Sequence, residues 1–249
     1  MYFDELSDLF ESDTIKPTFE YVHIILALFV FEEHPDGIGR YRLRDELLIG
    51  AGTAKSLINK LKEKINFIKV SEENKRKGHV LTKKGLDFLD KIKKKIPIIQ
   101  PGDTNILKNI IIDSENAKTY YCVIKESAKQ LSDGMTQRDA AIKIGGEGAT
   151  CLYFDGKDFN FALISATESE KSKMKLEKDV EEYFLTQIDK LDHTLKKDDV
   201  IIIGIGNIKE EYESLKIKKE EKRKKEANLV AERRSRLSAL NAALTLLPE

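Results

Sequence analysis

The stretch GRYRLRDELLIGAGTAKSLINKLKE (Gly39 to Glu63) decides the fold of the first third of the chain. Its apolar spacing predicts two helices, Tyr41 to Leu48 and Thr53 to Lys64, joined by the turn Gly50-Ala51-Gly52. Two helices that cross steeply through a short turn need a positive φ, which glycine adopts at little cost. We therefore expect the glycines to make the turn and Thr53 to cap the helix that follows.

The residues on either side of this stretch extend the pattern. Before it come a short acidic helix, Met1 to Phe10, and a strongly apolar helix, Thr18 to Glu33. After it come two β-like segments, Phe67 to Val70 and His79 to Leu81, and a closing helix, Thr82 to Lys95. This order of helices around a Gly-containing turn, followed by a two-stranded wing, predicts a winged helix-turn-helix.

Charge is unevenly distributed along a chain whose net charge is zero. Residues 1–39 carry nine acidic residues and one lysine, a net charge of −8. Residues 51–100 carry fourteen basic and five acidic residues, a net charge of +9. A basic block that coincides with a helix-turn-helix indicates a nucleic-acid partner, here double-stranded DNA.

The predicted recognition helix has a buried face and a polar face. Ala54, Leu57, Ile58 and Leu61 recur at i, i+3, i+4 and i+7 and are assigned to the core. Because the first half of a recognition helix reaches base edges, the residues expected to read bases are Thr53, Lys55, Ser56 and Asn59. Of these, Asn59 suits adenine and Lys55 suits guanine. The residues expected to contact phosphates are Arg40, Arg42, Arg44, Lys60, Lys75, Arg76 and Lys77.

Two other interpretations of this face stay open. One is that the polar face is simply the solvated surface of a lysine-rich protein. The other is that the face belongs to a protein-interaction module of the transcription apparatus that never reads bases.

The pattern changes after Ile96 to Thr104 (IPIIQPGDT), where prolines and a glycine predict a linker. The strands predicted beyond it are Ile106–Ile112, Thr119–Lys125, Ala149–Phe154, Phe159–Ile164 and Val200–Ile205. The helices predicted beyond it are Gln137–Ile144, Glu168–Leu195 and Ile208–Leu247.

From Thr119 onward the element order is β-α-β-β-α-β-α, which favours an α+β fold. We expect a mixed or antiparallel sandwich with a ferredoxin-like β-α-β-β-α-β order, helices on one face of the sheet and a long helix at the end. The predicted domains are a winged-helix DNA-binding domain with an acidic N-terminal helix (1–96), a linker (97–104) and an effector or dimerisation domain (105–249).

Few residues of the second domain indicate chemistry. A possible effector pocket, its ligand unknown, is predicted from Gln137, Arg138, Asp139 and Lys143 together with Gly204 and Gly206. A solvated helix surface and a plain strand-end turn are the alternatives. If Arg138 and Asp139 converged with Gly204 to Asn207 in one pocket, an enzyme with an accessory winged helix would be favoured instead. No catalytic residue, metal site or cofactor is predicted.

Three segments carry a family resemblance: GMTQRDAAIKIGGEGATCLYFDG (Gly134 to Gly156), DDVIIIGIGN (Asp198 to Asn207) and LNAALTLL (Leu240 to Leu247). They resemble the C-terminal domain of a family of archaeal proteins that pair an N-terminal winged helix with a domain of unknown function. Gly39 to Glu63 is similar to the same stretch of archaeal and bacterial winged-helix regulators. The family is usually taken for transcriptional regulators, so the resemblance implies a DNA-binding regulator with no established chemistry. The charged insert Glu210 to Arg236 departs from the family's pattern.

The cysteine content and the apolar segments predict where the protein is located and whether it forms a dimer. Cys122 and Cys151 are the two cysteines, which excludes a disulfide scaffold and a four-cysteine zinc site, and we interpret both as core thiols. The longest apolar run, Ile24 to Phe31, is far shorter than the ~20 residues of a membrane span, so we expect a cytoplasmic protein with no membrane contact. We expect a homodimer because one recognition helix covers one half-site. Its expected interface is one of two apolar seams, Phe3, Leu6 and Phe10 or Leu237, Leu240, Leu244 and Leu247.

Overall fold

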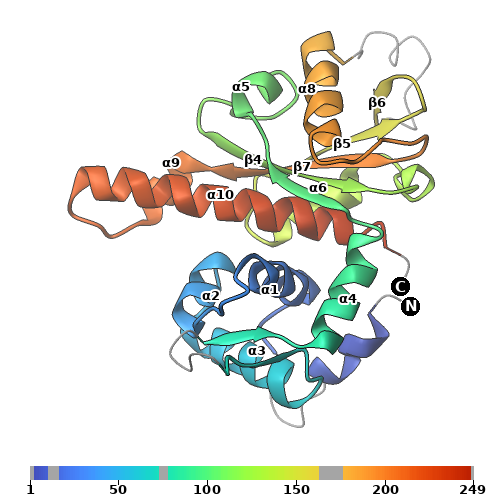
Figure 1. The fold of residues 1–249 in the computed structure, drawn as a ribbon. Coiled ribbons are helices and arrows are strands. Elements are labelled where there is room, and N and C mark those ends of the chain that lie inside the picture. Colours follow the sequence, from blue (N-terminus) through green and yellow to red (C-terminus); the bar gives the residue numbers. More distant parts are fainter. Residues whose placement is uncertain (1–2, 11–16, 73–77, 163–175, 248–249) are drawn as a thin grey trace. The chain divides into compact units, whose positions relative to one another are not determined.

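The computed structural model describes residues 3–10, 17–72, 78–162 and 176–247. The chain divides into two compact units. Unit 1 comprises Met1–Lys94 with Leu247–Glu249, and unit 2 comprises Lys95–Leu246. About half of the described residues are helical, and every described strand pair is antiparallel (Figure 1).

Unit 1 is built from helices and one small sheet. In chain order its elements are η1 (Asp4–Leu9), α1 (Tyr21–Glu33), α2 (Arg40–Glu46), α3 (Ala51–Glu63), β1 (Ile68–Val70), β2 (His79–Leu81) and α4 (Lys83–Lys93). Helix α1 is apolar on all sides, and every residue from Val22 to Phe31 is buried. Its N-terminus is closed by a capping box between Glu20 and His23.

The turn between α2 and α3 differs from the prediction. Helix α3 begins at Ala51 with Gly50 as its N-cap, so Thr53 lies inside the helix and does not cap it. The positive φ that the turn needs is at Leu48, with φ 51°, while Gly50 has an ordinary extended conformation with φ −67°. Leu48 adopts this conformation because α2 ends there: the Leu48 N–H donates to Asp45 O and the Ile49 N–H to Arg44 O.

The small sheet extends to a third segment of the chain. Strands β1 and β2 pair in the register Lys69 with Val80, and Ile38 forms a two-way backbone bridge to His79. This bridge requires Gly78, because a Cβ there would lie 2.2 Å from Ile38 O. After β2, Thr82 caps α4 by accepting a hydrogen bond from the Gly85 N–H.

The N-terminal segment packs inside unit 1, which corrects one predicted dimer seam. It forms a 3-10 helix whose Leu6 and Leu9 are fully buried. The ring of Phe3 stacks on Tyr21 at 4.8 Å between centroids, and Phe10 packs against Phe19 at 5.7 Å. Leu6 is therefore already buried by its own chain, and the half-buried Phe3 and Phe10 pack against aromatic rings of the same unit.

Unit 2 surrounds one sheet. In chain order its elements are β3 (Ile98–Pro101), α5 (Thr104–Leu107), β4 (Ala117–Ile124), η3 (Ala128–Gln130), α6 (Met135–Lys143), β5 (Gly148–Phe154), β6 (Phe159–Phe161), α8 (Lys178–Asp189), β7 (Val200–Asn207), α9 (Ile208–Ser214) and α10 (Glu220–Leu244). The described strands form a five-stranded sheet in the order β3-β4-β7-β5-β6.

Two predictions near the start of unit 2 are wrong. The expected linker contains β3, an edge strand paired with β4, and its Pro101 is tolerated at the strand end. The expected strand Ile106–Ile112 instead begins with the short helix α5, which Asp103 caps by accepting from the Asn105 N–H at 2.9 Å. The isoleucines that suggested a strand follow this helix in irregular structure.

The predicted element order β-α-β-β-α-β is confirmed, but the ferredoxin-like strand order is not. A ferredoxin-like sheet inserts the third strand of this order between the first two, whereas here β7, the fourth, lies between β4 and β5. β6 is left at the edge as the hairpin partner of β5. Sequence order alone leaves this choice open because it depends on pairing between distant segments.

Helices cover both faces of the sheet, which corrects the expectation of one covered face (Figure 1). On one face, Phe184 and Ile188 of α8 and Leu107 of α5 form a core with Tyr121 and Ile203. On the other face lie α6 and the long helix α10.

Helix α10 approaches the sheet closely because glycines face it. A Cβ on Gly204 would lie 2.2 Å from Ala239 N, and one on Gly206 would lie 2.0 Å from Ala231 O. Small side chains on both surfaces let the helix backbone rest almost directly on β7. Of the second predicted seam, Leu237, Leu240 and Leu244 on α10 and Leu247 after it are all buried.

The charged insert Glu210 to Arg236 forms a helical hairpin, since the predicted helix Ile208–Leu247 is interrupted between α9 and α10. The Arg223 guanidinium donates to Tyr212 O at 2.6 Å and lies 4.1 Å from the centre of the Tyr212 ring. Arg234 forms an ion pair with Glu211 at 3.2 Å. These contacts fix the N-terminal half of α10 against α9.

Candidate nucleic-acid interface and cavity

Helix α3 presents the predicted polar face to solvent. The predicted core face, Ala54, Leu57, Ile58 and Leu61, is buried as expected. On the opposite side Lys55, Ser56 and Asn59 are exposed, and none of them has a hydrogen-bond or ion-pair partner among the described residues. Their donors and acceptors are therefore available to an external partner.

Two other predicted contact residues of α3 are used within unit 1. The hydroxyls of Thr53 and Thr18 form a hydrogen bond of 2.7 Å. The Lys60 ammonium donates to Leu9 O at 2.5 Å. Thr53 and Lys60 thus anchor the N-terminal segment, which helical spacing alone does not reveal because their partners lie 35 and 51 residues away.

The three arginines of α2 differ in whether their guanidinium groups are free to bind an external partner. The guanidinium groups of Arg40 and Arg44 lie 4.9 Å and 5.7 Å from the centre of the Tyr41 ring. Arg44 also forms an ion pair with Asp45 at 2.6 Å, which offsets its charge. Arg42 is exposed and has neither an aromatic nor an acidic partner among the described residues. Lys75, Arg76 and Lys77, which the sequence predicts to contact phosphates, lie outside the described part of the chain.

The predicted effector pocket does not form. Gln137 is buried and donates to the Thr245 hydroxyl at 2.7 Å, so it joins α6 to the end of α10. Gly204 and Gly206 contact α10, and no ligand fits where the helix backbone already lies. Arg138 and Asp139 form an exposed ion pair of 2.9 Å, and Lys143 is exposed beyond them. Of the six residues, Arg138 alone reaches the cavity described next.

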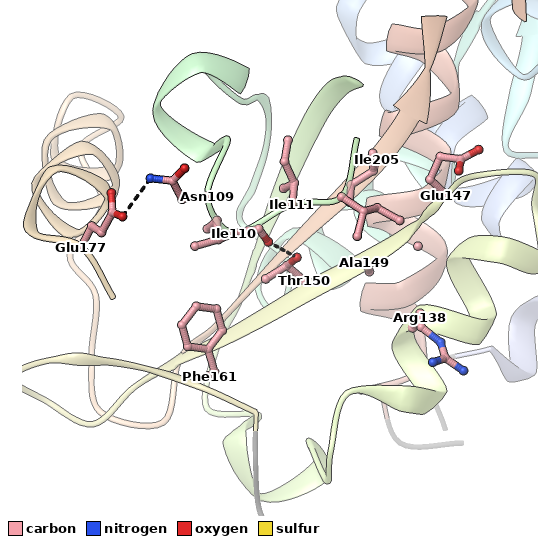
Figure 2. A pocket seen from close by; sticks show the side chains of 12 residues that line it. Asn109, Ile110, Ile111, Arg138, Glu147, Ala149, Thr150, Phe161, Glu177 and Ile205 are labelled. Carbon is pink, nitrogen blue, oxygen red and sulfur yellow. Dashed lines mark hydrogen bonds between the residues drawn. The ribbon is translucent and has the colours of Figure 1, made fainter. Parts of the chain in front are cut away.

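A cavity of about 550 Å³ lies instead on the α8 side of the sheet (Figure 2). Its lining comes from the segment after α5, from α6, from β5 to β7 with the residue before β5, and from the N-cap of α8: Asn109, Ile110, Ile111, Ile112, Arg138, Glu147, Gly148, Ala149, Thr150, Phe161, Glu177 and Ile205. The Thr150 hydroxyl donates to Ile110 O at 2.7 Å and thereby fixes the isoleucine segment over β5. Sequence reasoning missed this cavity because it assigned the isoleucines to a strand.

Carboxylates gather beside one end of the cavity. Burial raises the pKa of Glu147, and a hydrogen bond and the negative charge of Glu210, with the charge of Asp113, raise that pKa further. Asp113 accepts hydrogen bonds from Asn116 and Asn207 at 3.1 Å and 3.2 Å. Among the described residues, no group of three or more His, Cys, Asp or Glu side chains is arranged to hold a metal ion.

The two cysteines lie on the face of the sheet opposite the cavity floor. Both thiols are free and buried, and they flank Ile202 in register on neighbouring strands. Burial raises the pKa of Cys122 and raises that of Cys151 to about 12. A thiol held protonated in this way is a poor nucleophile, as expected of a core residue.

Known proteins resemble the chain in part. Residues 116–219 match a family model described as a domain of unknown function (DUF4443). A solved structure described as hypothetical protein PH0730 from Pyrococcus horikoshii OT3 is similar to the chain with a TM-score of 0.55 and 20% identity, covering 92% of this chain and 93% of that chain. No curated protein matches the chain. The match confirms a domain of unknown function in unit 2, and the structural likeness shows a shared fold. No described helix is both long and apolar enough to cross a membrane.

Proposed function

We propose that the protein is a DNA-binding transcriptional regulator. In this proposal unit 1 is a winged helix-turn-helix that reads the major groove with α3, and unit 2 senses a small molecule in its cavity. The observation that carries the proposal is the face of α3 on which Lys55, Ser56 and Asn59 are exposed and unpartnered opposite a fully buried face.

The order of elements in unit 1 supports this interpretation. A three-segment sheet formed by Ile38, β1 and β2 follows the order expected of a wing, with α2 and α3 between its first and second segments. Short polar side chains on the first half of α3 suit base edges, and Arg42 suits a phosphate. Phosphate contacts by Lys75, Arg76 and Lys77 remain a prediction.

The test is selection of bound sequences from a random DNA pool with the full-length protein, followed by footprinting of the enriched site. A groove-reading helix should enrich one short motif, and a homodimer should enrich two copies at a fixed spacing near a multiple of about 10 base pairs. A pool that stays random after repeated selection would contradict base readout.

A protein-interaction module is the second candidate. It is favoured by the N-terminal segment, because Thr53 and Lys60 already bind a hydroxyl and a backbone carbonyl of this chain. A flank of α3 that accepts polypeptide in this way also suits an external peptide. A binding partner that protects Asn59 from solvent in the absence of DNA would favour this function.

A further inference from the structure

The cavity of unit 2 has mostly apolar walls. Ile110, Ile111, Ala149, Phe161 and Ile205 contribute side chains to them, as Figure 2 shows. A volume of about 550 Å³ lies within the range of pockets that enclose small organic ligands. An apolar molecule would gain free energy by displacing water from this surface.

Among the described residues, the charges around the cavity are mainly negative. At one end the Glu177 carboxylate accepts a hydrogen bond from the Asn109 amide at 2.8 Å (Figure 2). At the other end is Glu147, which has further carboxylates, Glu210 and Asp113, as neighbours. No described lysine or arginine forms an ion pair with Glu147 or Glu177.

Arg138, the one cation among the described lining residues, is already partnered. The Arg138 guanidinium donates two hydrogen bonds to the Asp139 carboxylate, at 2.9 Å and 3.1 Å. It is therefore poorly placed to bind the carboxylate of a ligand. By contrast, an incoming cation would relieve the repulsion between Glu147 and its acidic neighbours.

We propose that the cavity binds an apolar molecule that carries a cationic amine, with the amine at Glu147 or Glu177 and the apolar body against the isoleucines and Phe161. This inference deepens the proposed sensing role of unit 2 and rests on it. It does not depend on which DNA sequence unit 1 reads.

The experiment is isothermal titration calorimetry of the full-length protein with three probes of equal length. 4-Phenylbutylamine, 4-phenylbutanol and 4-phenylbutyrate each have a phenyl ring and a four-carbon chain and differ in the charge of the terminal group, with the carboxylate carbon of the butyrate as its fourth chain carbon. We expect the amine to bind at least about tenfold more tightly than the alcohol, as a charge-assisted hydrogen bond implies, and the butyrate to bind most weakly. Equal binding of amine and alcohol, tighter binding of butyrate, or no binding of any probe would overturn the proposal.

Variants identify the anchoring carboxylate. Glu147→Gln and Glu177→Gln keep the shape of the cavity, and at least one should weaken the amine about tenfold while leaving the alcohol unchanged. Glu213→Gln, at an exposed position on α9, is the matched control and should change neither affinity. If both cavity variants and the control bind the amine alike, the amine is not held by these carboxylates and the proposal fails.

A second measurement separates this inference from the proposed function. DNA affinity is titrated with and without saturating 4-phenylbutylamine. Amine binding that passes the calorimetric test supports the inference even if DNA affinity does not respond, in which case the sensing role fails. DNA binding without amine binding overturns the inference and leaves DNA recognition intact.

Discussion

Helix α3 carries three lysines and α10 carries lysines and arginines, but the two helices differ in how many of these cations the fold already uses. On α3, Lys55 and the polar residues beside it have no partner among the described residues. On α10, Arg234 donates to Ile144 O at 3.0 Å and to Glu211, and Arg223 holds α9. The comparison teaches that the number of charges on a helix does not indicate function; what matters is whether the fold already uses them.

Glycines also distinguish the two helices, because Gly206 is packed against α10 whereas Gly52 on α3 has open space around it. Replacing Gly206 should give the largest change in stability. Gly206→Ala would place a Cβ 2.0 Å from Ala231 O, a backbone atom that cannot rotate away. We expect the variant to lose about 3 kcal/mol of unfolding free energy, measured by urea denaturation followed by circular dichroism. Gly52→Ala on α3 is the control: its Cβ meets nothing within 4 Å, and the substitution should stabilise by up to about 1 kcal/mol. Similar stability of the two variants would contradict the close packing of α10 on β7.

The second-largest expected effect is on the salt dependence of DNA affinity. With Lys60 hydrogen-bonded to Leu9 O, the cations expected to reach DNA are Lys55 at a base edge and Arg42, Lys75, Arg76 and Lys77 at phosphates. Each displaces about one counterion, so the slope of log K against log salt should be about −4 to −5 per subunit. Lys55→Ala should make the slope shallower by about 0.9, whereas Lys60→Met should leave it unchanged. Fluorescence anisotropy at several salt concentrations measures both, and equal slopes for the two variants would contradict the distinction.

The parts of the fold that were predictable from sequence are those set by local periodicity. The buried face of α3 and the strands β4, β5 and β7 follow from apolar spacing, which reports burial directly. The positive φ at Leu48 was not predictable. Residue type shows that glycine adopts a positive φ easily, but it does not show which residue of a given turn adopts one. The partners of Thr53 and Lys60 and the position of β7 in the sheet depend on distant segments, so local spacing carried no signal for them.

The candidate sites show the same limit. Lys55, Ser56 and Asn59 were predictable because a helix with one buried face has one exposed face. The cavity was not, because its walls come from six separate stretches of the chain and include isoleucines that local propensity assigns to a strand. Gly204 and Gly206 were misread because glycines that admit a helix and glycines that admit a phosphate look alike in sequence.

The smallest effect concerns the acidic end of the cavity. The pKa of Glu147 is raised above its ordinary value in the folded protein, chiefly by burial and by Glu210, so folding favours its protonated form. Its contribution to stability is therefore lost as the pH rises from 4.5 through the folded pKa. Glu147→Gln should be more stable than the wild type at pH 7, by at most about 1 kcal/mol because the group is largely solvated, and should lose this advantage below pH 4.5. Thermal denaturation across this range tests it, and an advantage that persists at low pH would point to another cause.

The central claim is that α3 reads bases, and the most direct test is the DNA sequence specificity of the Asn59→Ala variant. The full-length variant and wild type are titrated against the selected DNA site and a scrambled duplex of the same composition. If α3 reads bases, Asn59→Ala should cost about 1–3 kcal/mol on the selected site and little on the scrambled duplex, because base contacts discriminate and phosphate contacts do not. If the variant binds both duplexes as the wild type does, α3 is not the reading helix, and the protein-interaction function takes precedence.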